Sequence, residues 1–198
     1  MKEIIVASKN KGKITEIAAV LAGLPVTVLD LDKFGDIPEV EETGDTFTAN
    51  AILKARHYAF FTGKACLADD SGLEVEALSG APGVYSARYA GEGASDEINN
   101  RKLLNALSGV APGKRNARFR CVLAFIDTDG KIITADGVCE GVILEKPQGA
   151  GGFGYDPLFY IPELGQTLAE ISVSDKNAIS HRGQALRNMS VKLAEHIK

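Results

Sequence analysis

The sequence has few cysteines, no tryptophan and no long apolar run. Its three cysteines, Cys66, Cys121 and Cys139, are odd in number, far apart and outside any CxxC pair. This pattern argues against a disulfide framework or a zinc site, and we expect buried thiols in a reducing cytoplasm. The apolar segment near Met1 is too short for a signal peptide or a membrane span. We therefore expect a cytoplasmic protein without a membrane partner.

An excess of positive charge is also missing. The chain has 22 lysines and arginines against 26 aspartates and glutamates, which gives a formal net charge of −4. Because a nucleic-acid-binding domain normally carries a basic face or a high pI, we expect no nucleic-acid partner. A small phosphate-rich substrate stays compatible with this charge, since a local group of lysines and arginines with a divalent cation can hold one. The 45% apolar content is that of a globular protein with a sizeable core.

The order of the predicted elements indicates an α/β fold. Residues 3–7 are typical of a buried strand, the segment from Lys13 to Gly23 of an amphipathic helix, and residues 25–31 of a second strand. Such a strand–helix–strand unit begins an α/β sheet. Further elements are predicted in this order: a helix over 46–61, a short strand over 65–68 that ends in a turn at 69–72, a long loop over 77–93, a helix over 95–107, strands over 118–126 and 131–144, and a helix over 180–198.

The two long strands in the middle of the chain are predicted to form a hairpin. The pair Asp129-Gly130 between them is a typical hairpin turn. A long hairpin between α/β-like ends indicates a mixed central sheet with two lobes around a cleft. Since no repeat, low-complexity tract or linker divides the chain, we expect residues 1–198 to form a single domain.

A lysine-rich loop precedes the first predicted helix. Backbone N–H groups and the helix dipole favour an anion at this position. The loop differs from a Walker A loop, because Ala7 replaces the first glycine and Ile14 replaces the magnesium-binding hydroxyl residue, which disfavours an ordinary P-loop NTPase. We interpret it as a phosphate cradle in which Lys13 contacts phosphate, or alternatively as an exposed turn with solvated lysines. Its residues are Ser8, Lys9, Asn10, Lys11, Gly12 and Lys13.

Two acidic pairs are candidates for a metal site. Glu41 and Glu42 precede a predicted helix, and Asp69 and Asp70 follow a predicted strand. Mg²⁺ prefers oxygen ligands and usually takes one or two carboxylates. Because neighbouring residues of an extended chain point to opposite faces, we expect Asp70 to face the metal and Asp69 to support it from behind. The alternatives are a solvated acidic loop and a turn that closes a strand.

Two later segments are candidates for binding a nucleoside. Four glycines surround Phe153 within six residues, and Phe153 or Tyr155 can stack on a base, which is worth ~1–3 kcal/mol. The alternative is a tight turn with both aromatics anchored in the core. Near the last helix, Lys176, His181 and Arg182 supply donors that can read a purine keto oxygen. Polar decoration of a helix start is the alternative for these three residues.

Together these segments resemble a known enzyme family. The matching stretches are SKNKGK at 8–13, EETGDTFTANAILKA at 41–55, LADDSGLEVEAL at 67–78, GAPGVYSARYAG at 80–91 and GGFGYDPLF at 151–159, with EKPQG and SHRGQAL in the C-terminal part. They resemble the non-canonical purine nucleoside triphosphate pyrophosphatases, the inosine triphosphate pyrophosphatase family. The likeness covers nearly the whole chain. Two departures are Lys9, where relatives have glycine, and Ala49, where many have glutamate.

The resemblance implies an elongated α/β fold, a homodimer, and Mg²⁺-dependent cleavage of inosine, deoxyinosine and xanthosine triphosphates to the monophosphate and pyrophosphate. It implies that residues 8–13 bind triphosphate and that Asp70 is metal ligand and proton acceptor. Glu41 and Glu42 are the remaining acidic candidates for its partner, and we favour Glu42 because it lies closer to the predicted helix. Ser71 would touch the substrate. The nucleoside side would comprise Phe153, Gly154, Tyr155, Asp156, Lys176, His181 and Arg182. The rival hypotheses are a pyrophosphatase for pyrimidine or modified nucleotides and a non-hydrolytic nucleotide- or RNA-binding protein.

Overall fold

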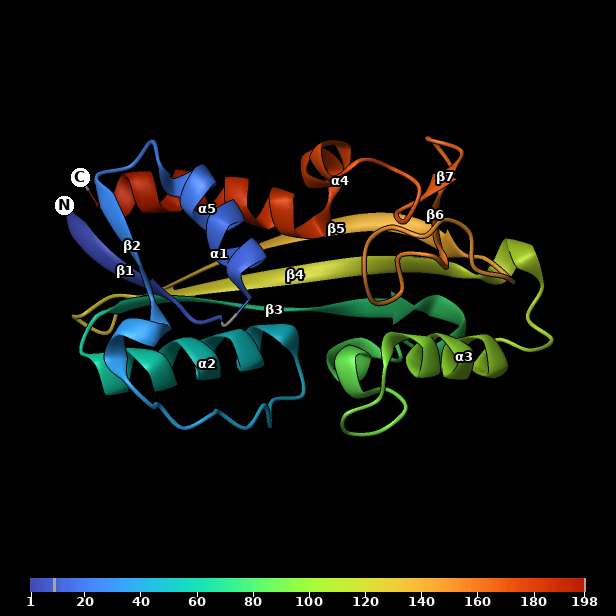
Figure 1. The fold of residues 1–198 in the computed structure, drawn as a ribbon, viewed down its shortest axis with the longest axis horizontal. Helices are drawn as coiled ribbons and strands as arrows, with labels where there is room; N and C mark the ends of the chain where they lie inside the picture. Colours follow the sequence, from blue (N-terminus) through green and yellow to red (C-terminus); the bar gives the residue numbers. More distant parts are fainter. Residues whose placement is uncertain (9, 198) are drawn as a thin grey trace. The chain divides into compact units, whose positions relative to one another are not determined.

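The computed structural model describes residues 1–8 and 10–197, without the side chains of 173 and 174. A seven-stranded sheet has the order β2-β1-β3-β4-β5-β6-β7 (Figure 1). Its strands are β1 (Lys2–Val6), β2 (Val26–Asp30), β3 (Ala65–Val75), β4 (Asn116–Ile126), β5 (Ile132–Ile143), β6 (Phe159–Ile161) and β7 (Gln166–Thr167). The helices are α1 (Lys11–Leu21), α2 (Phe47–Thr62), α3 (Asp96–Ala106), α4 (Val173–Ile179) and α5 (His181–His196). Short 3-10 turns are η1 (Leu31–Phe34), η2 (Glu76–Leu78), η3 (Gly83–Arg88) and η4 (Pro112–Lys114).

The predicted α/β fold with a mixed sheet is confirmed. Strand β1 runs parallel to both β2 and β3, whereas β6 is antiparallel to β5 and β7. The predicted hairpin turn closes where Gly130 N–H donates to the Asp127 carbonyl at 3.0 Å, and Gly130 has a φ of 85°. The predicted helices over 46–61 and 95–107 agree with α2 and α3 within two residues.

The prediction of a short third strand is wrong. Strand β3 does not end at Ala68 but continues to Val75, so the expected turn at 69–72 does not exist. Ser71 and Gly72 are residue types common in turns and therefore suggested one. Leu73 and Val75 beyond them are completely buried, and this burial extends the strand. Both aspartates of the predicted metal site therefore lie inside a strand.

The chain divides into two compact units. Unit 1 comprises residues 1–70, 121–137 and 184–198, and unit 2 comprises residues 71–120 and 138–183. The predicted arrangement of two lobes around a cleft stays a prediction. No helix among the described residues combines the length and the apolar character that crossing a membrane requires.

Unit 1 is layered on both faces of its part of the sheet. On one face, Ile4 and Val6 of β1 pack with Ile17 of α1 and Met189 of α5. On the other face, Ile5 packs in a cluster with the buried residues Leu31, Tyr58 and Cys66. Figure 1 shows α1 and α5 on one side of these strands and α2 on the other. Residues 4–6 of β1 are consequently all apolar, as expected of the part of a parallel strand that is buried on both faces.

Unit 2 has its own core. Leu73 of β3 and Phe119 of β4 pack there with Phe159 of β6 and with Leu103 and Leu107 at the end of α3. Helix α3 begins with Ser95 as its N-cap, whose side chain accepts a hydrogen bond from Ile98 N–H. The core contacts at its other end fix α3 against the sheet of this unit.

The three cysteines, all among the described residues, are buried and not disulfide-bonded. Burial raises the pKa of the Cys66 thiol to about 12 and that of Cys139 to about 11. At neutral pH both are therefore protonated and behave as small apolar side chains.

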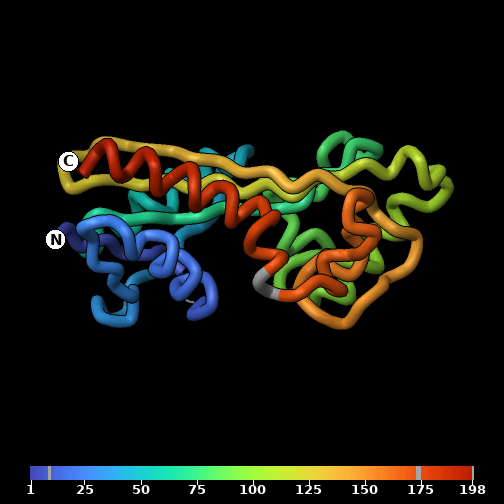
Figure 2. The backbone as a smooth tube through the Cα atoms, turned by 90° about the horizontal axis from the view of Figure 1, so that it is seen from above, coloured from blue at the N-terminus to red at the C-terminus, as the bar shows by residue number. Residues whose placement is uncertain are grey.

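A buried carboxylate joins distant segments of unit 1. Asp127 accepts hydrogen bonds from Lys2, from His196 Nε2 at 2.5 Å and from Thr128 N–H at 2.7 Å. Figure 2 shows the end of α5 beside the turn between β4 and β5. Burial by itself would raise the pKa of Asp127, but the hydrogen bonds from Lys2, His196 and Thr128 outweigh burial and lower it to about 2.

We predict that Asp127→Asn destabilises the protein in a pH-dependent way. The depressed pKa of Asp127 contributes stability that is complete above its unfolded value of 3.8 and is lost as the pH falls towards about 2. The variant should therefore have a free energy of unfolding about 1–2 kcal/mol below wild type at pH 7, a difference that shrinks between pH 4 and pH 2. Urea unfolding at several pH values measures this. Asp129→Asn in the same turn is the control, and a pH-independent difference would contradict the prediction.

Candidate active site

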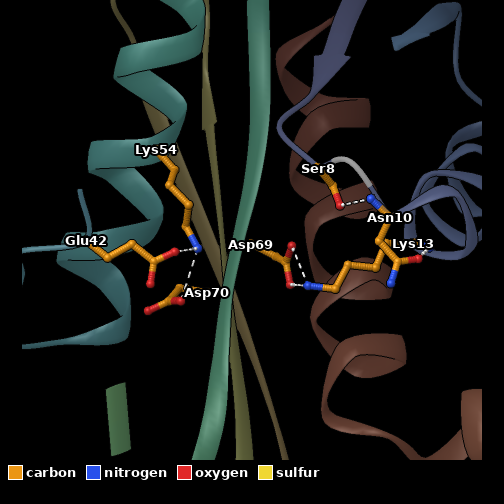
Figure 3. Close-up of polar contacts among 7 residues, drawn as sticks. All are labelled: Ser8, Asn10, Lys13, Glu42, Lys54, Asp69 and Asp70. Carbon is orange, nitrogen blue, oxygen red and sulfur yellow. Dashed lines mark hydrogen bonds and ion pairs between the residues drawn. The ribbon is translucent and has the colours of Figure 1, made fainter. Parts of the chain in front are cut away.

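Strand β3 carries Asp69 and Asp70 on opposite faces (Figure 3). Asp69 accepts from Lys13 Nζ of α1, at 2.9 and 3.3 Å to its two oxygens. Asp70 Oδ1 accepts from Lys54 Nζ of α2 at 3.1 Å. The predicted separation of the aspartates is confirmed, although an uninterrupted strand and not a strand end produces it.

The lysine-rich loop lies at the end of β1 and the start of α1. Asn10 is the N-cap of α1, and its side chain accepts from Lys13 N–H at 3.1 Å. Asn10 N–H in turn donates to Ser8 Oγ at 3.1 Å. Lys11 and Gly12 of the first turn are exposed, and Lys9 lies outside the described residues. The loop thus presents a capped helix N-terminus of the kind that binds phosphate.

The pairing of β1 with β3 ends just before the aspartates. Val6, the last residue of β1, pairs with Leu67, and Ala7 N–H then donates to the Leu67 carbonyl at 2.8 Å. Beyond this point the chain leaves the sheet towards α1. In open α/β sheets, ligands bind outside the carboxyl ends of the strands. The lysine-rich loop, Asp69 and Asp70 are found at this position.

On the α2 face of β3, a lysine joins two carboxylates. Lys54 Nζ lies 2.9 Å from Glu42 Oε1 and 3.1 Å from Asp70 Oδ1, and the Lys54 side chain is 13% exposed. Burial alone would lower the pKa of Lys54, but the surrounding carboxylates, with Asp70 foremost, raise it, so this ammonium stays charged. Burial also raises the pKa of Asp70; Lys54 opposes that rise and Glu42 adds to it.

A buried asparagine places the acidic loop against α2. Asn50 is completely buried, and its Oδ1 accepts from Gly44 N–H at 2.7 Å. An added Cβ on Gly44 would lie 2.7 Å from Asn50 Oδ1 and 2.8 Å from the Ala49 Cβ, so only glycine fits. This close packing brings Glu42 to Lys54, whereas Glu41 is exposed.

The Glu42 and Asp70 carboxylates fit a hard cation. They converge on one positive charge, at present the Lys54 ammonium, and Asp70 Oδ2 is buried with no hydrogen-bond partner among the described residues. No group of three or more His, Cys, Asp or Glu ligands occurs in the part of the chain that the structure describes. Two carboxylates suffice for Mg²⁺, because water and phosphate normally supply its other ligands.

Unit 2 holds the glycine-rich loop around a buried aspartate. Asp156 accepts from Phe153 N–H at 2.9 Å and from Lys176 of α4. Lys176 Nζ also lies 4.5 Å from the centroid of the Phe153 ring, which is otherwise 62% exposed. Gly152 has a φ of 72°, and an added Cβ there would overlap the Asp156 carboxylate.

The two aromatic residues of this loop have different surroundings. Tyr155 is buried in the unit 2 core, and its hydroxyl donates to the Ser86 carbonyl at 2.7 Å. It is therefore a core anchor, as the alternative interpretation of the sequence has it, while Phe153 presents its ring to solvent. An exposed aromatic ring on a tightly hydrogen-bonded loop is a suitable stacking surface for a base.

The other predicted residues of unit 2 are placed as follows. His181, at the start of α5, is buried, and its ring stacks on Phe119 at 5.0 Å between centroids. Arg182 and Ser71 are half-buried, and Ser71 follows Asp70 in β3. The geometry of unit 2 thus brings Phe153, Asp156 and Lys176 into direct contact.

The sequence analysis missed Asn50 and Lys54. A signal was present, since residues four apart lie on one face of a helix, and this spacing places both beside the acidic loop that precedes α2. Functional lysines were expected only in the loop at residues 8–13 and at Lys176, and the helical pattern alone gave Lys54 no partner.

Comparison with known proteins gives a consistent result. The model of the Ham1 family matches residues 4–192 of the chain. A protein of Geobacter sulfurreducens named dITP/XTP pyrophosphatase is 57% identical over 94% of this chain and 94% of its own length. Another of that name, from Desulforamulus reducens, is 56% identical over 93% of this chain and 92% of its own.

Solved structures are similar over the same extent. A HAM1 protein from Coxiella burnetii has a TM-score of 0.93 and 46% identity, with 98% of this chain and 100% of that chain covered. A structure from Mycobacterium abscessus, titled nucleoside-triphosphatase / dITP/XTP pyrophosphatase, has a TM-score of 0.82 and 40% identity, with 94% and 98% covered.

We predict that Gly152→Ala destabilises the protein by about 2–4 kcal/mol, because alanine is strained at this φ and its Cβ displaces the Asp156 carboxylate. Urea unfolding measures the change. Gly113→Ala is the matched control, since an added Cβ there meets no heavy atom within 4 Å. Equal stability of the two variants would show that the glycine-rich loop does not need its observed conformation.

Proposed function

This chain belongs to the Ham1 family, and from that premise we propose that it hydrolyses the non-canonical purine nucleoside triphosphates ITP, dITP and XTP to the monophosphate and pyrophosphate. Such a hydrolase would remove these nucleotides from the nucleotide pool. The observation that carries the proposal is the ion-paired Glu42–Lys54–Asp70 group on the α2 face of β3, in a chain similar over nearly its whole length to dITP/XTP pyrophosphatases.

Mg²⁺ is the proposed cofactor, with Asp70 and Glu42 as its protein ligands. When bound, it would neutralise phosphate oxygens and the charge that develops on them. Asp70 Oδ2, which has no hydrogen-bond partner among the described residues, is the proposed acceptor of a proton from the water that attacks the α-phosphorus. Lys54 holds Asp70 Oδ1 and Glu42 Oε1, so that both carboxylates keep their orientation.

The loop at residues 8–13 is the proposed site for the departing pyrophosphate. Lys13 and the N-terminus of α1 would offset its negative charge. Asp69 keeps the Lys13 ammonium in place through two contacts, and Asn10 caps the helix. Ser8, Lys11 and Gly12 complete the described part of this loop, and Lys9 is included on the resemblance alone.

The base is proposed to bind in unit 2. The exposed Phe153 ring offers a stacking surface, and Lys176 lies beside it as a donor. His181 and Arg182 are the other proposed donors, while Gly154, Tyr155 and Asp156 form the loop that carries the ring. A donor that faces a keto oxygen favours hypoxanthine and xanthine over adenine, because adenine presents an amino group there. Ser71 is proposed to contact the substrate next to Asp70.

The remaining features of the proposal concern the setting of the enzyme. We infer that it acts in the cytoplasm as a homodimer, on a free nucleotide, without nucleic-acid or membrane partners. The family resemblance supports the dimer, and the net charge of −4 supports a small-molecule substrate over a nucleic acid.

We predict that the protein with Mg²⁺ releases pyrophosphate from ITP, dITP and XTP at least about tenfold faster, in kcat/KM, than from ATP, UTP or dTTP, since a mismatched donor costs roughly 1–3 kcal/mol. A coupled pyrophosphate assay measures this. Preference for UTP or dTTP would favour the rival hypothesis of a pyrimidine-directed pyrophosphatase. Release of orthophosphate would favour an ordinary NTPase. Binding without any product would favour a nucleotide sensor.

The control for this assay is Asp70→Asn, which should abolish pyrophosphate release while circular dichroism shows an intact fold. Asp129→Asn, an exposed aspartate in the turn between β4 and β5, should retain full activity. Near-normal turnover in the Asp70 variant would remove Asp70 from its proposed role as proton acceptor.

We predict that Lys54→Met makes the protein's stability more dependent on Mg²⁺. The substitution removes the ammonium that Glu42 and Asp70 share, and losing one partner of a buried ion pair costs ~3–5 kcal/mol. Added Mg²⁺ should therefore raise the melting temperature of the variant more than that of wild type, without any nucleotide. Lys64→Met, which breaks the exposed Lys64–Glu3 pair, is the control. An identical Mg²⁺ response in all three proteins would contradict a cation site at Glu42 and Asp70.

A further inference from the structure

Two side chains of helix α3 bind the backbone of one residue of the glycine-rich loop, Gly154. Asp96 Oδ2 accepts a hydrogen bond from Gly154 N–H at 2.6 Å, and Asn100 Nδ2 donates to the Gly154 carbonyl at 2.9 Å. The two side chains are four residues apart and thus on one face of α3. Since Gly154 N–H and C=O belong to successive peptide groups, both peptide planes that flank this residue are fixed.

The peptide group between Phe153 and Gly154 decides where the aromatic ring lies. The N–H of this peptide group, that of Gly154, donates to Asp96. Phe153 N–H donates to Asp156 Oδ2 at 2.9 Å. The Phe153 carbonyl accepts from Asp156 N–H at 3.2 Å. The backbone on both sides of Phe153 is therefore fixed by hydrogen bonds, although its side chain is 62% exposed. Core packing does not hold this ring: hydrogen bonds fix the backbone that carries it, and Lys176 lies over its face.

Helix α3 is itself firmly anchored in unit 2. Asn99, which is buried, accepts from Ala90 N–H at 2.8 Å and donates to the Ala87 carbonyl at 3.1 Å. Leu103, one turn further on, is completely buried in the unit 2 core. A helix fixed in this way can transmit its position to the loop through Asp96 and Asn100.

We propose that Asp96 and Asn100 are positioning residues for base binding: they hold Gly154 so that the Phe153 ring is oriented for stacking before the nucleotide arrives. The inference rests on the proposed function, because it assumes that the base stacks on Phe153. Both residues act through the backbone of Gly154. Their effect is to reduce the conformational freedom that the loop loses when the base binds.

The test compares Asp96→Ala and Asn100→Asp with wild type in steady-state hydrolysis of ITP. Asp96→Ala removes the acceptor for Gly154 N–H. Asn100→Asp is isosteric and replaces the amide donor with an oxygen that faces the Gly154 carbonyl. Each variant should raise KM roughly tenfold, the loss of one hydrogen bond and of an ordered loop, with kcat changed less than about twofold. Inhibition by inorganic tripolyphosphate, which has no base, should be unchanged. Asp96→Asn, which keeps an oxygen acceptor, should recover most of the affinity.

Two controls separate positioning from general damage. Glu97→Ala removes a neighbouring acid from the same first turn of α3, and Asn105→Asp adds the same charge at an exposed position of this helix. Both should behave as wild type. An unchanged KM in Asp96→Ala and Asn100→Asp would overturn the inference, and so would an equal weakening of tripolyphosphate inhibition or a failed rescue by Asp96→Asn. If wild type itself releases no pyrophosphate from any nucleotide, the proposed function fails instead.

Discussion

The alternation of side chains along β3 is the constraint on which the candidate site depends. Because Asp69 and Asp70 are neighbours in an extended strand, their carboxylates must face opposite sides of the sheet. Each buried negative charge then needs a cation from the helix on its own side: Lys13 from α1 and Lys54 from α2. One dipeptide thereby links the lysine-rich loop, the acidic loop and two helices of unit 1.

The candidate site residues of the two units are held in place by different kinds of interaction. In unit 1, ion pairs between buried carboxylates and lysines fix the side chains that would act on phosphate. In unit 2, the Phe153 ring is placed by hydrogen bonds to its own backbone and to that of Gly154. A stacking ring must stay exposed until the base arrives, so it cannot be held by burial.

Much of this architecture was predictable from local sequence signals, and the failures have a common physical cause. The hairpin at Asp129-Gly130, helix α2 and the opposite orientation of Asp69 and Asp70 all follow from turn chemistry and periodicity. The length of β3 did not, because Ser71-Gly72 imitates a turn and only tertiary burial of Leu73 and Val75 extends the strand. The role of Lys54 was missed for the same reason. Helical periodicity predicts which face of α2 carries this residue, but it does not predict that this face packs against β3.

The Lys54 ammonium also has a consequence for the order of assembly. A pair of buried carboxylates without a counter-ion would repel each other, and such a fold would wait for its metal. Here the chain brings its own positive charge to Glu42 and Asp70, so part of the repulsion between them is offset before any metal binds. A divalent cation that binds there has to compete with the Lys54 ammonium for the Glu42 and Asp70 oxygens. Folding and metal binding are therefore coupled less tightly here than in a site that has no positive charge of its own.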